Sequence, residues 1–180
     1  METISPESFK LSKLKMIPRK INNGYNIDLL YNDKHFGLQS PKCTIEEIIY
    51  NNNDITNIEI SFKINKNFKY YQFFGVFDNI LIDYLQNFVV QHKIMPQKTV
   101  SEVFNSGTNS DFNSEKVFLN LKINKETLFF TRDFKKTFAL DFNKGDKVVF
   151  IFFTKGIFLD THGINYRWTA KQMLKYNIKK

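Results

Sequence analysis

Aromatic and basic residues interleave in three stretches of the sequence. These are KLKMIPRKINNGY (13–25), FFTRDFKKTF (129–138) and the closing segment THGINYRWTAKQMLKYNIKK (161–180). Cationic side chains can neutralise phosphates, and flat rings can stack on bases at roughly 1 to 3 kcal/mol per base. The chemistry that these stretches favour is therefore binding of single-stranded nucleic acid without sequence preference.

Individual side chains can be assigned to the two roles. The predicted phosphate contacts are Lys13, Lys15, Arg19, Lys20, Arg132, Lys135, Lys136, Arg167 and Lys171. The predicted base contacts are Tyr25, Phe36 and Phe134, with Phe130 and Tyr166 as further candidates, while Phe129, Phe150, Phe152 and Trp168 are expected in the core. The alternative is that each ring belongs to the core and each cation is its solvated neighbour, because alternation along a strand produces both patterns.

Signals for catalysis are sparse. The sequence contains no GxSxG elbow, no glycine-rich phosphate loop, no HExxH and no pair of His or Cys at ligand spacing. His35, His92 and His162 lie far apart, and Cys43 is the one cysteine. We therefore expect no enzyme, no metal site and no cofactor, although a carboxylate site assembled in three dimensions stays open as an alternative.

The net charge of +8 is concentrated near the two ends of the chain. Residues 8–27 and 161–180 each carry five basic side chains and no acidic one, whereas residues 28–160 carry 16 of each sign. If the two segments meet in space, they form one basic surface that attracts a polyanion.

Size and composition predict one intracellular domain. A chain of 180 residues with 42% hydrophobic side chains can bury a core without disulfides, and a single cysteine suits a reducing compartment. We see no secretory signal and no apolar run long enough to span a membrane; the longest candidate is VVFIFF (148–153).

Hydrophobic periodicity predicts many strands and one helix. Residues 57–64 alternate as a half-buried strand, and residues 71–92 carry apolar side chains at helical spacing. Residues 94–115 are expected to form an exposed polar loop, and residues 177–180 a flexible end. Further strands are predicted at 117–123, 127–133, 136–142, 147–153 and 164–175, joined as an antiparallel meander, with an early hairpin turn at 22–24.

The predicted fold is a single mainly β domain, 1–180, shaped as an OB-like antiparallel barrel with one central α-helix at about 71–92. Such a barrel protects its sheet edges by closing on itself. A β-sandwich is the alternative. In the last strand, period two places Trp168 inward and Arg167, Lys171, Met173 and Lys175 outward.

The order of these parts resembles the single-stranded DNA-binding proteins of nucleocytoplasmic large DNA viruses. The similarity is carried by HFGLQSPKC, NIEISFKI, FFGVFDNILIDYLQNF, FLNLKI and KGDKVVFIFFTKGIFLDTHGINYRWTAKQM, the last with Gly163-x4-Trp168-x3-Gln172. Proteins of that family are OB-fold proteins related to phage single-stranded DNA-binding proteins.

The resemblance implies a viral replication and repair protein that coats displaced single strands in the host cytoplasm or viral factory, with replication proteins as further partners. Two features depart from the pattern. The chain ends YNIKK in place of an acidic recruiting tail, and Lys34-His35 stand where a Trp usually precedes FGL, which leaves Phe36 as the stacking residue of that segment.

One rival function belongs to a different class. A structural or assembly protein of a large DNA virus particle would meet nucleic acid only incidentally through its charge. It would show a large apolar surface patch, a stable oligomer and no preference for single strands. The sequence leaves a homo-oligomer open in either case.

Overall fold

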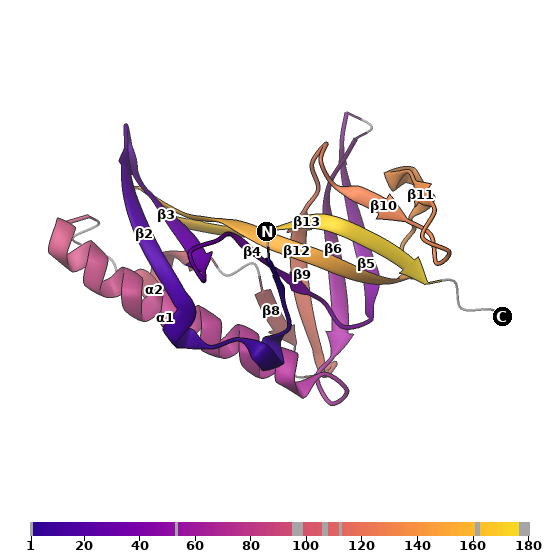
Figure 1. The fold of residues 1–180 in the computed structure, drawn as a ribbon, viewed down its shortest axis with the longest axis horizontal. Helices are drawn as coiled ribbons and strands as arrows, with labels where there is room; N and C mark the ends of the chain where they lie inside the picture. Colours follow the sequence, from indigo (N-terminus) through magenta and orange to yellow (C-terminus); the bar gives the residue numbers. More distant parts are fainter. Residues whose placement is uncertain are drawn as a thin grey trace.

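The fold is described from a computed structural model, which describes residues 2–52, 54–94, 99–105, 108–111, 113–160 and 163–176. Figure 1 shows a β-barrel at one end of the molecule and a projecting hairpin at the other, with one long helix running beneath both.

Five strands pair in a closed ring. β5 pairs with β6, β6 with β9, β9 with β13, β13 with β12, and β12 with β5. Only the β9–β13 pair is parallel. The strands are β5 (Cys43–Asn51), β6 (Asp54–Lys63), β9 (Lys116–Lys122), β12 (Lys147–Asp160) and β13 (Ile164–Tyr176). The prediction of an OB-like barrel is confirmed, and the closed ring excludes the β-sandwich alternative.

The sheet continues beyond the barrel because β12 is longer than β5, β6 and β9. Its first half pairs with β5 and β4 (Phe36–Gln39), and its end pairs with β3 (Gly24–Tyr31). β3 forms the predicted early hairpin with β2 (Leu14–Ile21), and β1 (Glu2–Ile4) runs parallel to β4. The pairing of β12 with β13 shifts register near Gly156, where φ is +124° and a Cβ would lie 2.5 Å from the carbonyl oxygen of Ile27. Glycine is therefore needed for the close approach of β12 to β3.

The predicted helix is confirmed as α1 (Phe68–His92), with three more residues at its start. Its apolar stripe, including Phe77, Leu81 and Leu85, is buried. The ring of Phe77 lies 5.9 Å from that of Trp168, and Phe88 meets Tyr25 edge to face at 5.0 Å. α1 therefore packs against both the barrel and the β2–β3 hairpin.

The segment 94–115 departs from the predicted exposed loop. It contains α2 (Val100–Val103), β7 (Phe104–Asn105) and β8 (Thr108–Asp111), with Val100 fully buried. β8 pairs with β9, and β7 runs parallel to β13. The polar sequence TNSD gives no apolar alternation, so pairing with a neighbour, and not burial of its own side chains, makes it a strand. Residues 95–98, 106–107 and 112 lie outside the described residues.

The predicted meander is wrong in the region after β9. β9 and β10 (Leu128–Phe130) do not pair with each other. Each pairs in parallel with a different part of β13 instead. The predicted strand 136–142 shortens to β11 (Lys136–Thr137) followed by a short 3-10 helix, η3 (Ala139–Asp141). Strand 147–153 is part of the longer β12. Local alternation identified these strands but could not give their partners.

The predicted strand 164–175 is confirmed as β13, but its inward and outward faces exchange part way along. Trp168 is buried and Arg167 exposed, as predicted. A register shift opposite Lys171 then reverses the alternation, so that Met173 is fully buried, contrary to prediction. Residues 177–180 lie outside the described residues.

Candidate nucleic-acid interface

A continuous outer face crosses the junction between the barrel and the β2–β3 hairpin. Arg19 on β2 lies opposite Asn26 on β3, Asn26 opposite Phe158 on β12, and Phe158 opposite Asn165 on β13. Directly opposed residues share one face of a sheet, so these side chains form a row. Alternation along β13 places Arg167 on the same face.

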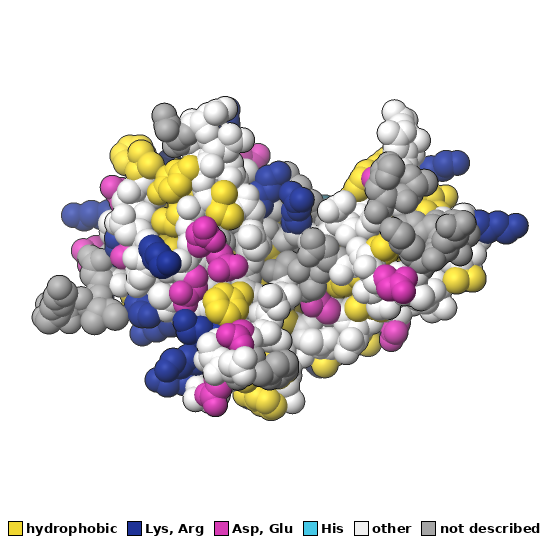
Figure 2. Space-filling view, turned by 180° about the vertical axis from the view of Figure 1, so that it is seen from behind, with side chains coloured by type: hydrophobic (Ala, Val, Ile, Leu, Met, Phe, Trp, Pro, Cys, Tyr) yellow, Lys and Arg dark blue, Asp and Glu magenta, His cyan; other side chains and the backbone are white. Residues whose placement is uncertain are grey.

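Two adjoining hollows lie on this face, with volumes of about 450 and 360 Å³, and share Lys122, Asn165 and Arg167. We call them together the polar groove. Its outward-facing residues are Asn57 and Glu59 on β6, Asn109 on β8, Phe118, Asn120 and Lys122 on β9, Phe158 on β12, Asn165 and Arg167 on β13, and Asn26 on β3. Seen from behind in Figure 2, the surface is notched between its two lobes, and Lys and Arg side chains lie on a wall of the notch.

Rings and amides alternate in the groove. Phe118 is half-buried between Ser61 and Asn109 on the neighbouring strands, and Phe158 is half-buried beside Asn26. Asn57 Nδ2 donates to Asn120 Oδ1 at 2.8 Å. This bond uses the amide nitrogen of Asn57 and the amide oxygen of Asn120. The other polar atom of each amide can still hydrogen-bond to a ligand. The groove thus offers flat apolar faces beside hydrogen-bonding groups.

Ion pairs fix the hairpin end of the face. Arg19 pairs with Asp28, which also accepts from Asn26 Nδ2 at 2.8 Å. Lys15 Nζ lies 2.6 Å from Asp33 Oδ1. Arg19 and Lys15 are themselves exposed, so part of each cation faces solvent.

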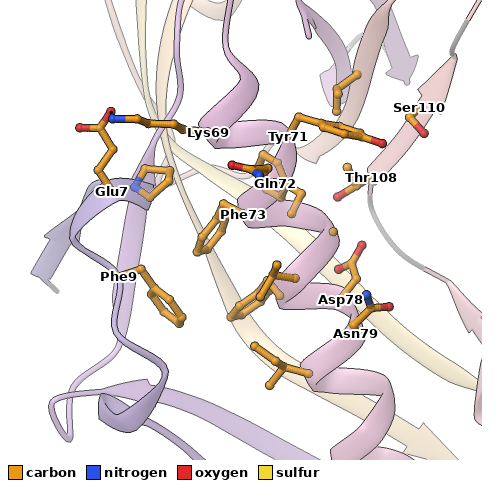
Figure 3. A pocket seen from close by; sticks show the side chains of 17 residues that line it. Glu7, Phe9, Lys69, Tyr71, Gln72, Phe73, Asp78, Asn79, Thr108 and Ser110 are labelled. Atoms are coloured by element: carbon orange, nitrogen blue, oxygen red, sulfur yellow. Dashed lines mark ion pairs between the residues drawn. The ribbon is translucent and has the colours of Figure 1, made fainter. Parts of the chain in front are cut away.

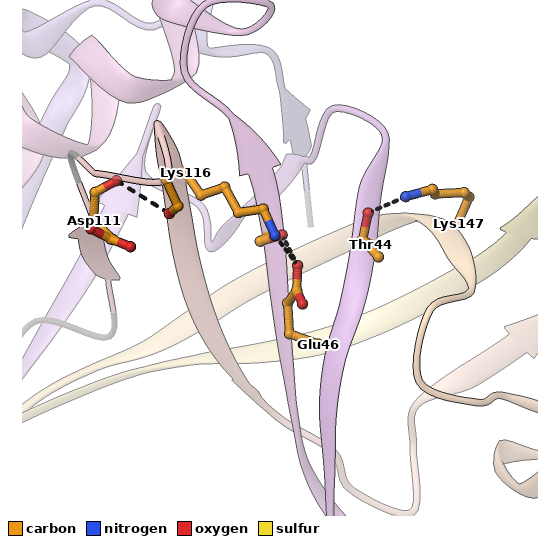
Figure 4. A network of polar contacts seen from close by, with 7 residues as sticks. Thr44, Glu46, Asp111, Lys116 and Lys147 are labelled. Carbon is orange, nitrogen blue, oxygen red and sulfur yellow. Dashed lines mark hydrogen bonds and ion pairs between the residues drawn. The ribbon is translucent and has the colours of Figure 1, made fainter.

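The opposite end of the face is acidic and internally paired. Glu46 accepts from Lys116 Nζ at 2.9 Å and from Ser61, while Lys147 donates to Thr44 (Figure 4). These contacts hold the pKa of Glu46 below its ordinary value, with the Ser61 hydrogen bond as the largest cause. Burial, with the nearby charges of Glu47 and Glu46, raises the pKa of Glu59. Lys116 is thus neutralised, and Glu59 marks an end of the groove that disfavours phosphates.

The sequence-predicted site residues fall into separate groups. Arg19 and Arg167 lie on the outer face with Lys15. Lys20 lies opposite Tyr25, whose ring contacts Phe88 and His92, so this pair belongs to the α1 side of the hairpin. Lys13 ends a short 3-10 helix, η2 (Leu11–Lys13), directly before β2, and its ammonium lies 5.8 Å from the centre of the Tyr31 ring.

Two aromatic candidates are corrected by their burial. Phe36 is 1% exposed and packs among Phe9, Tyr31 and Phe77, so its ring presents no face to a base. Tyr166 is 2% exposed, and burial raises the pKa of its phenol well above the ordinary value. The expected core rings Phe129, Phe150, Phe152 and Trp168 are buried as predicted.

The remaining candidates lie at the other end of β13. Arg132, Phe134, Lys135 and Lys136 belong to the β10–β11 hairpin, whose Phe130 lies opposite Leu174. Leu174 lies seven positions after Arg167, which is about 20 Å along a strand. Lys171 is half-buried at the register shift between them. Among the described residues of the two charged segments, only Arg167 shares a face with β2, so these residues do not form one basic surface.

Among the outward-facing cations and rings of the groove, Lys122, Phe118 and Phe158 were not predicted. A usable signal existed for the first two, because Phe118, Asn120 and Lys122 alternate with Val117, Leu119 and Leu121, which are buried. In the sequence, Phe118 resembles one more apolar residue of a core strand. Only the pairing of β9 with β6 and β13 shows that the outward face of β9 forms the floor of a groove between these two strands.

A larger hollow, of about 820 Å³, lies around α1 (Figure 3). Lys69, the one cation among its described lining residues, pairs with Glu7 at 3.1 Å, and the carboxylate of Asp78 lies farther along the helix. Since neither group favours a phosphate, this hollow suits a polyanion less than the polar groove does.

Other candidate chemistry finds no support in the described part of the chain. No group of three or more His, Cys, Asp or Glu side chains there could hold a metal ion. Cys43 is buried, and burial raises the pKa of its thiol to about 12, so the thiolate is disfavoured. Among the described residues, no helix is both long and apolar enough to cross a membrane.

Comparison with known proteins identifies the fold. No family model and no curated protein sequence matches the chain. The structure of a single-stranded DNA-binding protein from bacteriophage Enc34 in complex with single-stranded DNA is 10% identical, with a TM-score of 0.51 over 92% of this chain and 97% of its own. The structure of gp2.5, a single-stranded DNA-binding protein encoded by bacteriophage T7, is 8% identical, with a TM-score of 0.54 over 79% and 92%. The chain has the fold of these phage proteins.

Proposed function

We propose that the protein binds single-stranded DNA in the polar groove, without sequence preference and without catalysis. The observation that carries the proposal is the groove itself, which crosses the face of a closed OB-like barrel and combines cations, half-buried rings and amides. The fold shared with two phage single-stranded DNA-binding proteins supports this assignment.

Each kind of side chain has a role in the proposed complex. Arg167, Lys122 and Arg19 contact phosphates, with Lys13, Lys15 and Lys20 as more distant charges along the hairpin. Phe118 and Phe158 stack on bases, which is sequence-tolerant because every base has a flat face. The amides of Asn57, Asn120 and Asn165 can donate or accept, so they hydrogen-bond to any base edge. Tyr25 packs against α1 and is not among the residues that line the groove, so it has no role in the proposed complex.

The number of cations sets the expected salt dependence. With three to five phosphates neutralised, and a slope of about −0.7 per phosphate for single strands, the logarithm of affinity should fall with the logarithm of salt at a slope of roughly −2 to −3.5.

The biological setting is part of the proposal. Coating of displaced strands during replication and repair fits a binder of this kind, and the resemblance to proteins of large DNA viruses suggests an infected host cell, in its cytoplasm or a viral factory. Replication proteins are the further partners.

The test compares single-stranded DNA, duplex DNA and RNA of the same length at two salt concentrations, by fluorescence anisotropy. We expect tightest binding to single-stranded DNA and the salt slope given above. A flat response to salt, or equal affinity for duplex, would contradict the proposal. The rival function in particle assembly predicts no preference for single strands and a stable oligomer, which light scattering would detect in the same samples.

A further inference from the structure

The end of the barrel formed by β10, β11 and η3 exposes three large apolar side chains within seven consecutive residues. Phe134, Phe138 and Leu140 are 76%, 79% and 69% exposed. We call this surface, with the adjoining hollow described next, the apolar end. Apolar groups gathered at one place on a surface commonly mark a site of interaction.

A hollow of about 690 Å³ adjoins these side chains and gives the surface a receptor shape. Phe138 lies on its wall, and the buried side chains of Ile55, Ile123 and Phe129 contribute its inner lining. Lys125 and Lys136 line it as well. An apolar hollow with cations beside it suits a bulky apolar side chain carried between acidic neighbours.

The charge of this surface is mixed. Lys125, Arg132, Lys135 and Lys136 are exposed, and none of them forms an ion pair within the described residues. Four acids, Asp54, Glu126, Asp133 and Asp141, lie in the same segments and balance these four cations, but Lys125 and Lys136 line the hollow itself, with Asp54 as the one acid among its described lining residues. A uniformly charged polyphosphate gains little here, whereas a peptide can match cations and apolar groups together.

The backbone holds the exposed side chains in place. Phe134, with φ of +58°, sits in a turn closed by two hydrogen bonds of 2.9 Å, from Phe134 N to Thr131 O and from Thr131 N to Lys135 O. Asp141 accepts from the backbone N–H of Phe138 at 3.1 Å and from Thr137, which fixes the start of η3. Side chains on a preformed turn lose little entropy when a partner binds.

We infer that the apolar end is a docking surface for a segment of a partner protein that carries a bulky apolar or aromatic side chain flanked by acidic residues. A second copy of this chain fits less well, because a two-fold interface would bring Lys135 and Lys136 of one copy against the same cations of the other. The inference goes beyond single-stranded DNA binding and uses none of the groove residues.

The experiment titrates the full chain into labelled nine-residue peptides and records fluorescence anisotropy. One peptide has a central Phe flanked by Asp and Glu, a second replaces the Phe with Ser, and a third replaces the acids with Lys. We expect saturable binding of the first peptide and at least tenfold weaker binding of the others. Phe138→Ala with Leu140→Ser, and separately Lys125→Glu with Lys136→Glu, should each weaken the first peptide at least tenfold.

Control variants test whether peptide binding depends on the apolar end alone. Val90→Ser removes an exposed apolar side chain on α1 and should leave peptide binding unchanged. The Phe138→Ala, Leu140→Ser variant should keep its circular dichroism spectrum and bind single-stranded DNA within twofold of the parent. The inference is overturned if the three peptides bind alike, if this variant loses DNA affinity, or if it abolishes a dimer of the parent chain.

Discussion

The polar groove and the apolar end both combine cations with aromatic rings, yet they are built differently. In the groove, Phe118 and Phe158 are half-buried on long strands, with amides and hydroxyls as neighbours. At the apolar end, Phe134 and Phe138 are exposed on a turn and beside a short 3-10 helix, next to an apolar hollow.

This difference shows that composition does not specify the ligand. A ring supported at its edges, with one face open between polar groups, is suited to stacking against a base. A ring that projects beside an apolar hollow is suited to packing against another apolar side chain. What surrounds each ring, and not the interleaving of Phe with Lys, distinguishes the two surfaces.

The largest expected effect removes the two central cations of the groove. Arg167→Ala with Lys122→Ala should lower affinity for single-stranded DNA about 100-fold at low salt, which is about 2.7 kcal/mol and is reasonable for two charge-assisted contacts. The salt slope should become shallower by about 1.4, because two phosphate contacts are lost. Anisotropy titrations at several salt concentrations measure both quantities.

The matched control makes the same change at the apolar end. Lys135→Ala with Lys136→Ala removes two exposed cations of the β10–β11 hairpin, which pairs with β13 about 20 Å beyond Arg167, and should change DNA affinity less than twofold. Equal losses in the two double variants would break the comparison, because the DNA would then contact both surfaces.

Replacing the groove rings should give the next largest effect. Phe118→Leu and Phe158→Leu keep apolar volume but remove the flat face, so each should cost roughly 1 to 3 kcal/mol of binding, or about 5- to 150-fold. Phe134→Leu at the apolar end serves as the control and should bind DNA normally. If Phe134→Leu weakened DNA binding and the two groove variants did not, Phe134 would contact the bases, as predicted from the sequence.

The sequence predicted elements better than their partners. Alternation at 57–64, helical spacing at 71–92 and alternation at 164–168 each identified the correct element, because each one buries its own apolar side chains. β8 has no such pattern and forms because β9 offers it backbone groups to pair with. The register shift beside Lys171 likewise depends on β12, so the burial of Met173 could not be read from β13 alone.

The candidate site shows the same limit. Arg19 and Arg167 were identified from their types and neighbours, and they do share a face. Phe36 could not be excluded from the sequence, since burial by Phe9, Tyr31 and Phe77 depends on segments distant in the chain. Lys122 alternates with the buried residues of β9, but only the pairing of β9 with β6 and β13 shows that this outward face lines a groove.

A change to the backbone tests whether the groove depends on its frame. Gly156→Ala puts a Cβ 2.5 Å from the carbonyl oxygen of Ile27 at φ of +124°, so it should lower the free energy of unfolding by about 1 to 3 kcal/mol. DNA affinity should fall too, because β12 and β3 carry Phe158 and Asn26. Urea denaturation checks stability.

Gly75→Ala is the control. A Cβ at position 75 would have no atom within 4 Å, so this change should stabilise α1 by roughly 0.5 to 1 kcal/mol and leave DNA binding unchanged.

The smallest expected effect comes from Glu59, the acid of the groove. Glu59→Gln removes a negative charge diagonal to Lys122 and should raise DNA affinity two- to fivefold at neutral pH, a change of about 0.4 to 1 kcal/mol. The pKa of Glu59 is raised by burial and by the charges of Glu47 and Glu46. Lowering the pH toward the raised pKa protonates Glu59 and should tighten DNA binding in the parent more than in the variant.

The same shift predicts the sign of a stability difference. Because the folded state holds the Glu59 proton more tightly than the unfolded state, ionisation of Glu59 costs stability above its folded pKa, and this cost disappears as the pH falls toward the unfolded value. Glu59→Gln should therefore be the more stable protein at neutral pH, and its advantage should vanish in acid. Glu126→Gln, an exposed acid near the apolar end, should shift neither profile. If DNA affinity depended on pH in the same way in the parent and in Glu59→Gln, Glu59 would not face the bound DNA. The acidic boundary of the groove would then have to be placed elsewhere on β6.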